Sequence, residues 1–119
     1  MEEAVAALSA SERSSLLKMI VDHPDLQPYL HPEAAGRVPV KVKSNQALGS
    51  SLSLEKFGQP VRFVASSEGA AVLEVLEFRL DEDRVAFSIF YEVEGLTLRG
   101  TLVRRQDQWT FEDVEAFES

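Results

Sequence analysis

Residues 85–103 read VAFSIFYEVEGLTLRGTLV, and this stretch decides the fold. Apolar side chains occupy alternate positions on both sides of Gly95, which is the pattern of two half-buried strands. Glu94 and Gly95 separate the two runs, and a glycine there can take the positive φ of a tight turn. The stretch therefore predicts a β-hairpin with one covered face. Its predicted inward residues are Val85, Phe87, Ile89, Tyr91, Val93, Leu96, Leu98 and Leu102.

The alternation continues on both sides of this hairpin. Leu76, Phe78 and Leu80 predict a preceding strand with the same inward face, followed by a turn at residues 81–83. After a further turn at residues 106–108, the segment from Trp109 to Val114 predicts a returning strand. Strands of about ten residues are about 30 Å long, and we expect a sheet of that length to curve around a covering element.

An amphipathic helix near the N-terminus provides that covering element. Ser9 and Glu12 match a capping box, which predicts a helix from about Ala10 to Asp22. Pro24 prevents its continuation. A helical turn across residues 2–8 is a further expectation. The apolar face of the helix consists of Leu16, Leu17, Ile20 and Val21, with Met19 at its margin.

The middle of the chain is less regular. Pro24 and Pro32 are each expected to open a short helical turn, and Gly36 to end the second. Residues 38–43 predict a short strand, which Pro39 marks as an edge strand or a strand start. Residues 54–57 predict a helical turn closed by a glycine, and residues 61–65 predict a strand after Pro60.

These elements predict an α+β fold in which an N-terminal helix packs on a curved antiparallel β-meander, as one domain over residues 1–119. Three segments, AFSIFYEVEG (86–95), LRGTL (98–102) and WTFE (109–112), resemble the last strands of the cystatin-like and nuclear-transport-factor-2-like architectures. In that superfamily a tryptophan commonly opens the final strand. The resemblance implies a cone-shaped fold. It implies no single function, since members are enzymes, ligand carriers or scaffolds.

Composition narrows the class of protein. The chain has 119 residues, no cysteine and a formal net charge of −8. The absence of cysteine excludes disulfides, thiolate zinc sites and a cysteine nucleophile, and it fits a cytoplasmic protein, although a cleaved leader stays open. The apolar runs are too short to span a bilayer, so no membrane association is expected. The acidic balance argues against nucleic acid and fits a basic protein partner.

No motif indicates catalysis, so a non-catalytic role is favoured while an enzyme stays open as an alternative, and no cofactor is expected. His23 and His31 lie among Asp22, Asp25 and Glu33, but their spacing matches no metal motif, so turn or capping roles are favoured over ligation. Tyr91 is the one predicted inward side chain able to transfer a proton. General acid–base catalysis needs a positioned group with a suitable pKa, and a buried tyrosine is more often structural.

Three functions stay open. The first is a non-catalytic interaction module, a homodimer or partner of another protein, with Phe90, Thr101 and Val103 as interface candidates on the exposed sheet face. The second is a carrier or enzyme for a small apolar ligand. The third is an acidic inhibitor or immunity-type protein using residues 81–83 with Glu92 and Glu94. Candidates for lining a pocket of the second kind are Tyr29, Phe78, Phe87, Tyr91 and Trp109.

Overall fold

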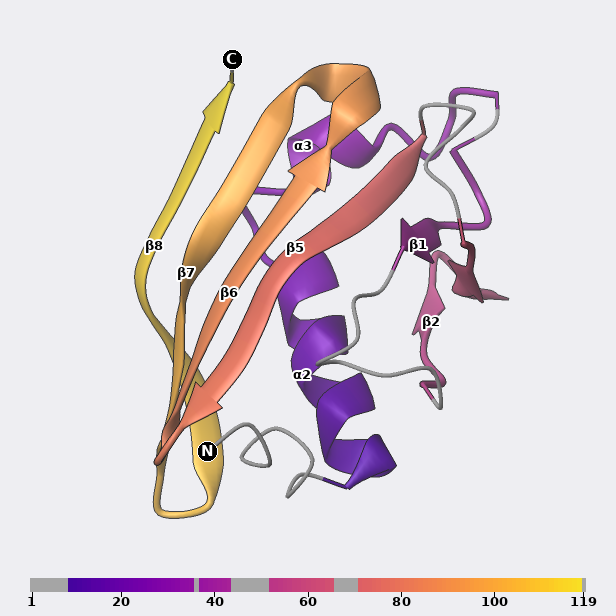
Figure 1. Ribbon diagram of the computed structural model, residues 1–119. Helices are drawn as coiled ribbons and strands as arrows, with labels where there is room; N and C mark the ends of the chain where they lie inside the picture. The colour runs from indigo at the N-terminus through magenta and orange to yellow at the C-terminus, as the bar shows by residue number, and fades with distance from the viewer. Residues whose placement is uncertain (1–8, 36, 44–51, 66–70, 119) are drawn as a thin grey trace.

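A helix lying across one face of a mostly antiparallel six-stranded sheet forms the body of the protein (Figure 1). The computed structural model describes residues 9–35, 37–43, 52–65 and 71–118. The expectations for residues 2–8 and for Gly36 lie outside the described residues. The predicted α+β class, with an N-terminal helix on an antiparallel sheet, is confirmed.

Four long strands form the predicted meander. They are β5 (Val72–Asp81), β6 (Arg84–Tyr91), β7 (Leu96–Arg105) and β8 (Gln108–Glu118), each antiparallel to the next. The register brings apolar residues of the predicted inward set opposite one another. The cross-strand pairs include Phe78 with Phe87, Ile89 with Leu98, and Val85 with Leu102. Since these residues are buried, the alternation identified the covered face correctly.

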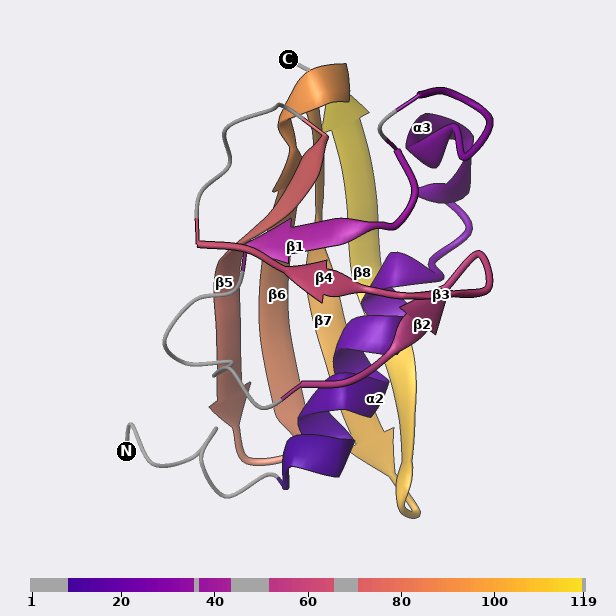
Figure 2. The same ribbon diagram turned by 90° about the vertical axis from the view of Figure 1, so that its right-hand side faces the viewer.

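The helix that covers this face is α2 (Ala10–Val21), and the predicted capping box is present. The Ser9 hydroxyl accepts a hydrogen bond from the Glu12 amide at 3.0 Å, and the Glu12 carboxylate accepts one from the Ser9 amide at 3.2 Å. The buried helix face packs into the core with β5–β8 and with Leu26 and Leu30. In Figure 2, α2 runs diagonally in front of the long strands.

A short parallel strand extends the sheet beyond β5. The strand β1 (Lys41–Lys43) lies between β4 (Arg62–Phe63) and β5 and is parallel to both. Figure 2 shows β1 and β4 running crosswise to β5–β8, so the sheet curls toward α2. Of the two alternatives for Pro39, the edge strand is wrong, because β1 is paired on both sides and the Val42 side chain is fully buried, whereas Pro39 does lie just before the start of the strand at Lys41.

Local structure in the middle of the chain departs from expectation. The predicted helical turn at residues 54–57 is instead a hairpin of β2 (Glu55–Lys56) and β3 (Gln59–Pro60). Phe57 and Gly58 both have positive φ, at 58° and 78°, which favours a tight hairpin turn over a helix. The short helix α3 (Gln27–Leu30) follows Pro24 by three residues, and no described residue after Pro32 is helical before β1.

Two residues of the predicted inward set point elsewhere. Leu76 is 52% exposed, because the β5–β6 register shifts between Val75 and Glu77. A β-bulge inserts one residue and so reverses the face of those beyond it. Val93 lies in a 3-10 helix, η1 (Glu92–Glu94), after the end of β6 and is 38% exposed. No helix among the described residues is long and apolar enough to cross a membrane.

Candidate functional site

The sheet has a second face, turned away from α2, which we call the outer face. No described helix or strand lies over it (Figures 1 and 2). Register places small and apolar side chains of β6 and β7 at its centre. Phe90 pairs with Thr97, Ala86 with Thr101, and Ser88 with Arg99. We call the uncharged residues of this region the central strip. It consists of Ala86, Ser88, Phe90, Thr97, Thr101 and Val103.

Three further apolar side chains are exposed beside or beyond the central strip. Phe117 on β8 pairs with Thr97 and is 42% exposed. Leu76 becomes exposed through the β5 bulge, and Val93 lies just beyond β6. Apolar side chains gathered in a rimmed patch are typical of a contact surface.

Charged side chains of β5 and β8 flank the central strip, and Arg99 interrupts it on β7 between Thr97 and Thr101. Several of these charged side chains are paired within the chain. Arg99 donates to Glu115 at 2.8 Å, and its guanidinium lies 5.2 Å from the centre of the Phe117 ring. Arg84 and Arg105 both bind Glu112, at 2.8 and 3.1 Å. These contacts hold the arginine side chains over the outer face and lower the pKa of the Glu112 carboxyl, chiefly through the Arg84 hydrogen bond.

The outer face is close to neutral although the chain is strongly acidic. By register the long strands β5–β8 carry four arginines and five carboxylates on this face, and β1 and β4 add Lys41, Lys43 and Arg62, whereas the whole chain has a net charge of −8. Most of the negative charge therefore lies on other surfaces. The charged residues that β5–β8 place on the outer face are Arg79, Arg84, Arg99 and Arg105 with Glu74, Glu77, Asp81, Glu112 and Glu115.

The predicted interface residues lie on the outer face, but their side chains differ in exposure. Phe90 and Thr101 are half-buried in the central strip. Val103 is 5% exposed, so it contributes little surface to any contact. Sequence reasoning missed Phe117, although it alternates with Glu115 at the end of β8, because the final strand was expected to stop at Val114. It missed Leu76, because a bulge leaves no local signal.

The five predicted pocket residues lie in different surroundings. Phe78, Phe87 and Tyr91 are almost fully buried in the packed core. Tyr29 lies at the end of the sheet, where its hydroxyl donates to Glu118 at 2.7 Å. Trp109 packs against the core with the Arg104 guanidinium 5.2 Å from its ring centre. A pocket shared by these residues stays a prediction: Phe78, Phe87 and Tyr91 lie in the packed core, and Trp109 lines a surface hollow.

Two open hollows flank the exposed serines of α2. One, of about 450 Å³, lies between α2 and residues 53–55, and the other, of about 280 Å³, lies beside Arg104 and Trp109. Several of their polar groups are already bonded. Lys18 pairs with Asp22, the Ser14 hydroxyl accepts from the Ser53 amide, and Arg104 binds Asp83. Both cations that line the hollows are therefore engaged within the chain rather than turned toward a ligand.

The acidic residues proposed for an inhibitor surface are far apart. Residues 81–83 form the turn before β6, and Glu92 and Glu94 follow its far end. The length of β6 separates the two groups, so a partner would have to span this whole strand to contact both. Asp83 is also occupied by Arg104, and Glu94 by Arg37.

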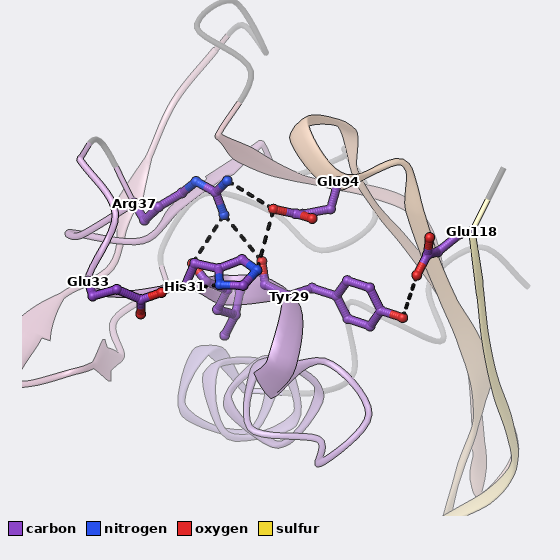
Figure 3. A network of polar contacts seen from close by, with 7 residues as sticks. Tyr29, His31, Glu33, Arg37, Glu94 and Glu118 are labelled. Atoms are coloured by element: carbon purple, nitrogen blue, oxygen red, sulfur yellow. Dashed lines mark hydrogen bonds and ion pairs between the residues drawn. The ribbon is translucent and has the colours of Figure 1, made fainter.

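A polar network fastens α3 and the following loop to the end of the sheet (Figure 3). Arg37 donates to Glu94 at 2.9 Å and to the carbonyl oxygen of Tyr29 at 3.2 Å. The His31 ring lies between Glu33 and Glu94. The Glu94 hydrogen bond raises the pKa of Arg37, and burial raises the pKa of Tyr91, whose ring the Arg37 guanidinium approaches to 5.7 Å.

The groups with acid–base capacity have structural partners. Tyr91 has a raised pKa in the core, which makes its hydroxyl a poorer acid near neutral pH. The Nδ1 atom of His23 accepts from the Asp25 amide at 3.1 Å, and the ring contacts Phe111 edge to face, so its predicted turn role is confirmed. Among the described ranges, no three histidine or carboxylate side chains gather as metal ligands would.

An ion pair at the C-terminal end of α2 predicts a pH effect on stability. Lys56 donates to Asp22 at 2.7 Å, and Lys18 is 3.0 Å away. Partial burial would raise the pKa of Asp22, but the hydrogen bonds from Lys56 and Lys18 outweigh it and lower that pKa. Because the folded pKa is depressed, the stabilisation is present above the unfolded value of 3.8 and is lost as pH falls through the folded value.

We therefore expect Asp22→Asn to cost less than about 1 kcal/mol near neutral pH, since the carboxylate is 40% exposed. The difference should shrink as pH falls below 3.8, and the variant and the parent should converge in stability below the folded pKa of Asp22. Urea unfolding at a series of pH values measures both. An equal stability difference at all pH values would contradict the role of the charge.

Comparison of the chain with protein-family models, with curated proteins and with solved structures finds no match. The site is accordingly interpreted from its own geometry.

Proposed function

We propose that this chain is a non-catalytic protein-interaction module that pairs with a second copy of itself through the outer face. The observation that carries the proposal is the layout of that face. A central strip of small and apolar residues on β6 and β7, interrupted by Arg99, is flanked by charged side chains of both signs on β5 and β8. An apolar centre with a polar rim is the usual anatomy of a protein–protein interface.

Charge favours a second copy over a strongly basic partner. A face with four arginines and five carboxylates presents both signs to an identical face. Two copies that each carry −8 repel at long range, so the near-neutral face is where they can approach with least repulsion. In a two-fold dimer the same patch serves both subunits, which an evenly mixed rim allows.

The size of the face sets the expected affinity. Four strands about 4.8 Å apart and about ten residues long give a flat area of about 600 Å². A standard interface buries about 800 Å² on each partner. The outer face is somewhat smaller, so we expect a dimer of micromolar rather than nanomolar affinity.

Substitutions on the outer face test the dimer. Phe117→Glu places a carboxylate beside the central strip, and Thr97→Glu places one within it. Each should weaken self-association at least about tenfold, which corresponds to about 1.4 kcal/mol. The measurement is sedimentation equilibrium of the full chain from about 1 µM to about 0.5 mM, a range that brackets micromolar affinity.

Phe57→Glu is the matched control. Phe57 is 39% exposed, similar to Phe117 at 42%, but it lies at the β2–β3 turn beside Lys56, on the helix side of the protein. This variant should dimerise as the parent does. A parent that stays monomeric throughout the concentration range, or a control that dissociates as readily as Phe117→Glu, refutes the proposal. The resemblance to the cystatin-like and nuclear-transport-factor-2-like architectures stays a separate prediction.

A further inference from the structure

The segment of residues 27–35 with Arg37 is attached to the end of the sheet mainly by polar contacts. Leu30 is its buried apolar anchor. Tyr29 reaches Glu118 at the end of β8, and Arg37 reaches Glu94 in η1. Figure 3 shows the Arg37–Glu94 contact above the His31 ring and the Tyr29–Glu118 contact to its right. The segment therefore joins two parts of the sheet that lie more than fifty residues further along the chain.

Both ring nitrogens of His31 face carboxylates. Nδ1 lies 3.2 Å from a Glu33 oxygen, and Nε2 lies 3.7 Å from a Glu94 oxygen. A neutral imidazole carries one N–H and no charge, whereas the imidazolium presents an N–H to each carboxylate: it can hydrogen-bond Glu33 and form an ion pair with Glu94. The charged ring therefore links the segment to η1 in a way that the neutral ring cannot.

We propose that residues 27–35 with Arg37 form a proton-controlled strap, which protonation of His31 holds against the β6–β7 connection. This goes beyond the proposed dimer and does not depend on it. Histidine is the side chain whose charge ordinarily changes between about pH 5 and pH 8. At the acidic end of that range the strap is closed, and at the alkaline end its cross-link through His31 is released while Arg37 remains bound.

The charges around the His31 ring favour its protonated form. The groups facing it are Glu33 on its own loop, Glu94 in η1, and Arg37, which shares Glu94. With neutral His31 this group has one positive and two negative charges, and one proton balances it. The tyrosine hydroxyls of Tyr29 and Tyr91 are uncharged across this range, since the pKa of each is raised above 10.0.

The contacts of the carboxylates Glu33 and Glu118 are compatible with this role of His31. Glu33 has a lowered pKa, through a backbone hydrogen bond first and the His31 contact second, so it stays ionised as His31 gains its proton. Glu118, the remaining carboxylate of the network, is held by Tyr29 and not by the ring.

The backbone at His31 suggests the variant to use. His31 has a φ of 47°, in the left-handed region, which asparagine tolerates better than most residues. His31→Asn therefore keeps the turn and removes the titrating group. His23→Asn is the matched control, because His23 lies outside the strap and asparagine can still accept from the Asp25 amide.

Hydrogen–deuterium exchange measures the closure. The reporter amides are those of Ala34, which donates to the His31 carbonyl at 2.9 Å, and Arg37, which donates to the Ala34 carbonyl at 3.3 Å. After correction for intrinsic rates, their protection in the parent should be about two- to fivefold higher near pH 5.5 than near pH 7.5, as expected for a partly exposed ion pair. The His23→Asn protein should keep this difference.

The His31→Asn protein should lose this pH dependence of protection. The Glu94→Gln protein should lose it too, because it lacks the carboxylate that faces the Nε2 atom of His31. Parent protection that does not change with pH overturns the proposal. So does a His31→Asn protein that retains the parent's pH dependence. Since exchange at these amides is read within a folded chain, the test is independent of whether the chain forms dimers.

Discussion

Replacing Phe87 by alanine is expected to lower the free energy of unfolding by about 3–5 kcal/mol. Phe87 is 2% exposed at the centre of the covered sheet face, opposite Phe78 on β5. Its ring meets the Phe111 ring of β8 edge to face, with centroids 6.0 Å apart. Removing it leaves a cavity between the sheet and α2 that surrounding side chains fill only in part.

Urea unfolding followed by far-ultraviolet circular dichroism measures the Phe87→Ala effect. A domain of ordinary stability unfolds with about 5–15 kcal/mol, so the variant should be marginal or unfolded at physiological temperature. Phe117→Ala is the control, because that ring lies on the outer face and is 42% exposed. Its loss should cost far less. Similar losses for the two variants would mean that the covered face has been misassigned.

Gly100→Ala is expected to lower the free energy of unfolding by about 1–3 kcal/mol, because it overpacks the β7–β8 pair. A Cβ atom at Gly100 would lie 2.7 Å from Val114 Cγ2 and 2.9 Å from Val114 Cα. The second of these atoms belongs to the backbone, so rotation of the Val114 side chain cannot relieve the clash. The strands have to separate locally where their register shifts between Arg99 and Thr101.

A double-mutant cycle tests this cause. Val114→Ala removes the clash with the Cγ2 methyl group and leaves the clash with the Val114 backbone, so the double variant should recover part of the Gly100→Ala loss. Strictly additive losses would show that the Val114 side chain does not contribute. Urea unfolding of the four proteins provides the four free energies that the cycle requires.

The two stability predictions concern residues on the covered face of the sheet, and the proposed dimer concerns its outer face. Phe87 and Gly100 form one cross-strand pair on the covered face, while their neighbours Ala86, Ser88 and Thr101 belong to the central strip. Losses at Phe87 act on folding, and substitutions at Thr97 or Phe117 act on association. Measuring unfolding and sedimentation on all variants separates the two effects.

The candidate site could be predicted in part. Strand alternation placed Phe90 and Thr101 on the outer face, because side chains point to opposite sides every second residue. It could not show that Val103 is nearly covered, since neighbouring side chains decide exposure. Nor could it find the contacts of Arg37 with Glu94 or of Tyr29 with Glu118, which join residues 57 and 89 positions apart.

The sequence by itself determined the helix at Ser9–Val21 and the antiparallel meander, because capping and alternation act between residues close in the chain. Only the tertiary structure decided the rest. The parallel insertion of β1 between β4 and β5, the bulge that exposes Leu76 and the network around His31 arise where distant segments meet. Their energies depend on neighbouring residues that no local sequence pattern specifies, so these features can be recognised only in the folded structure.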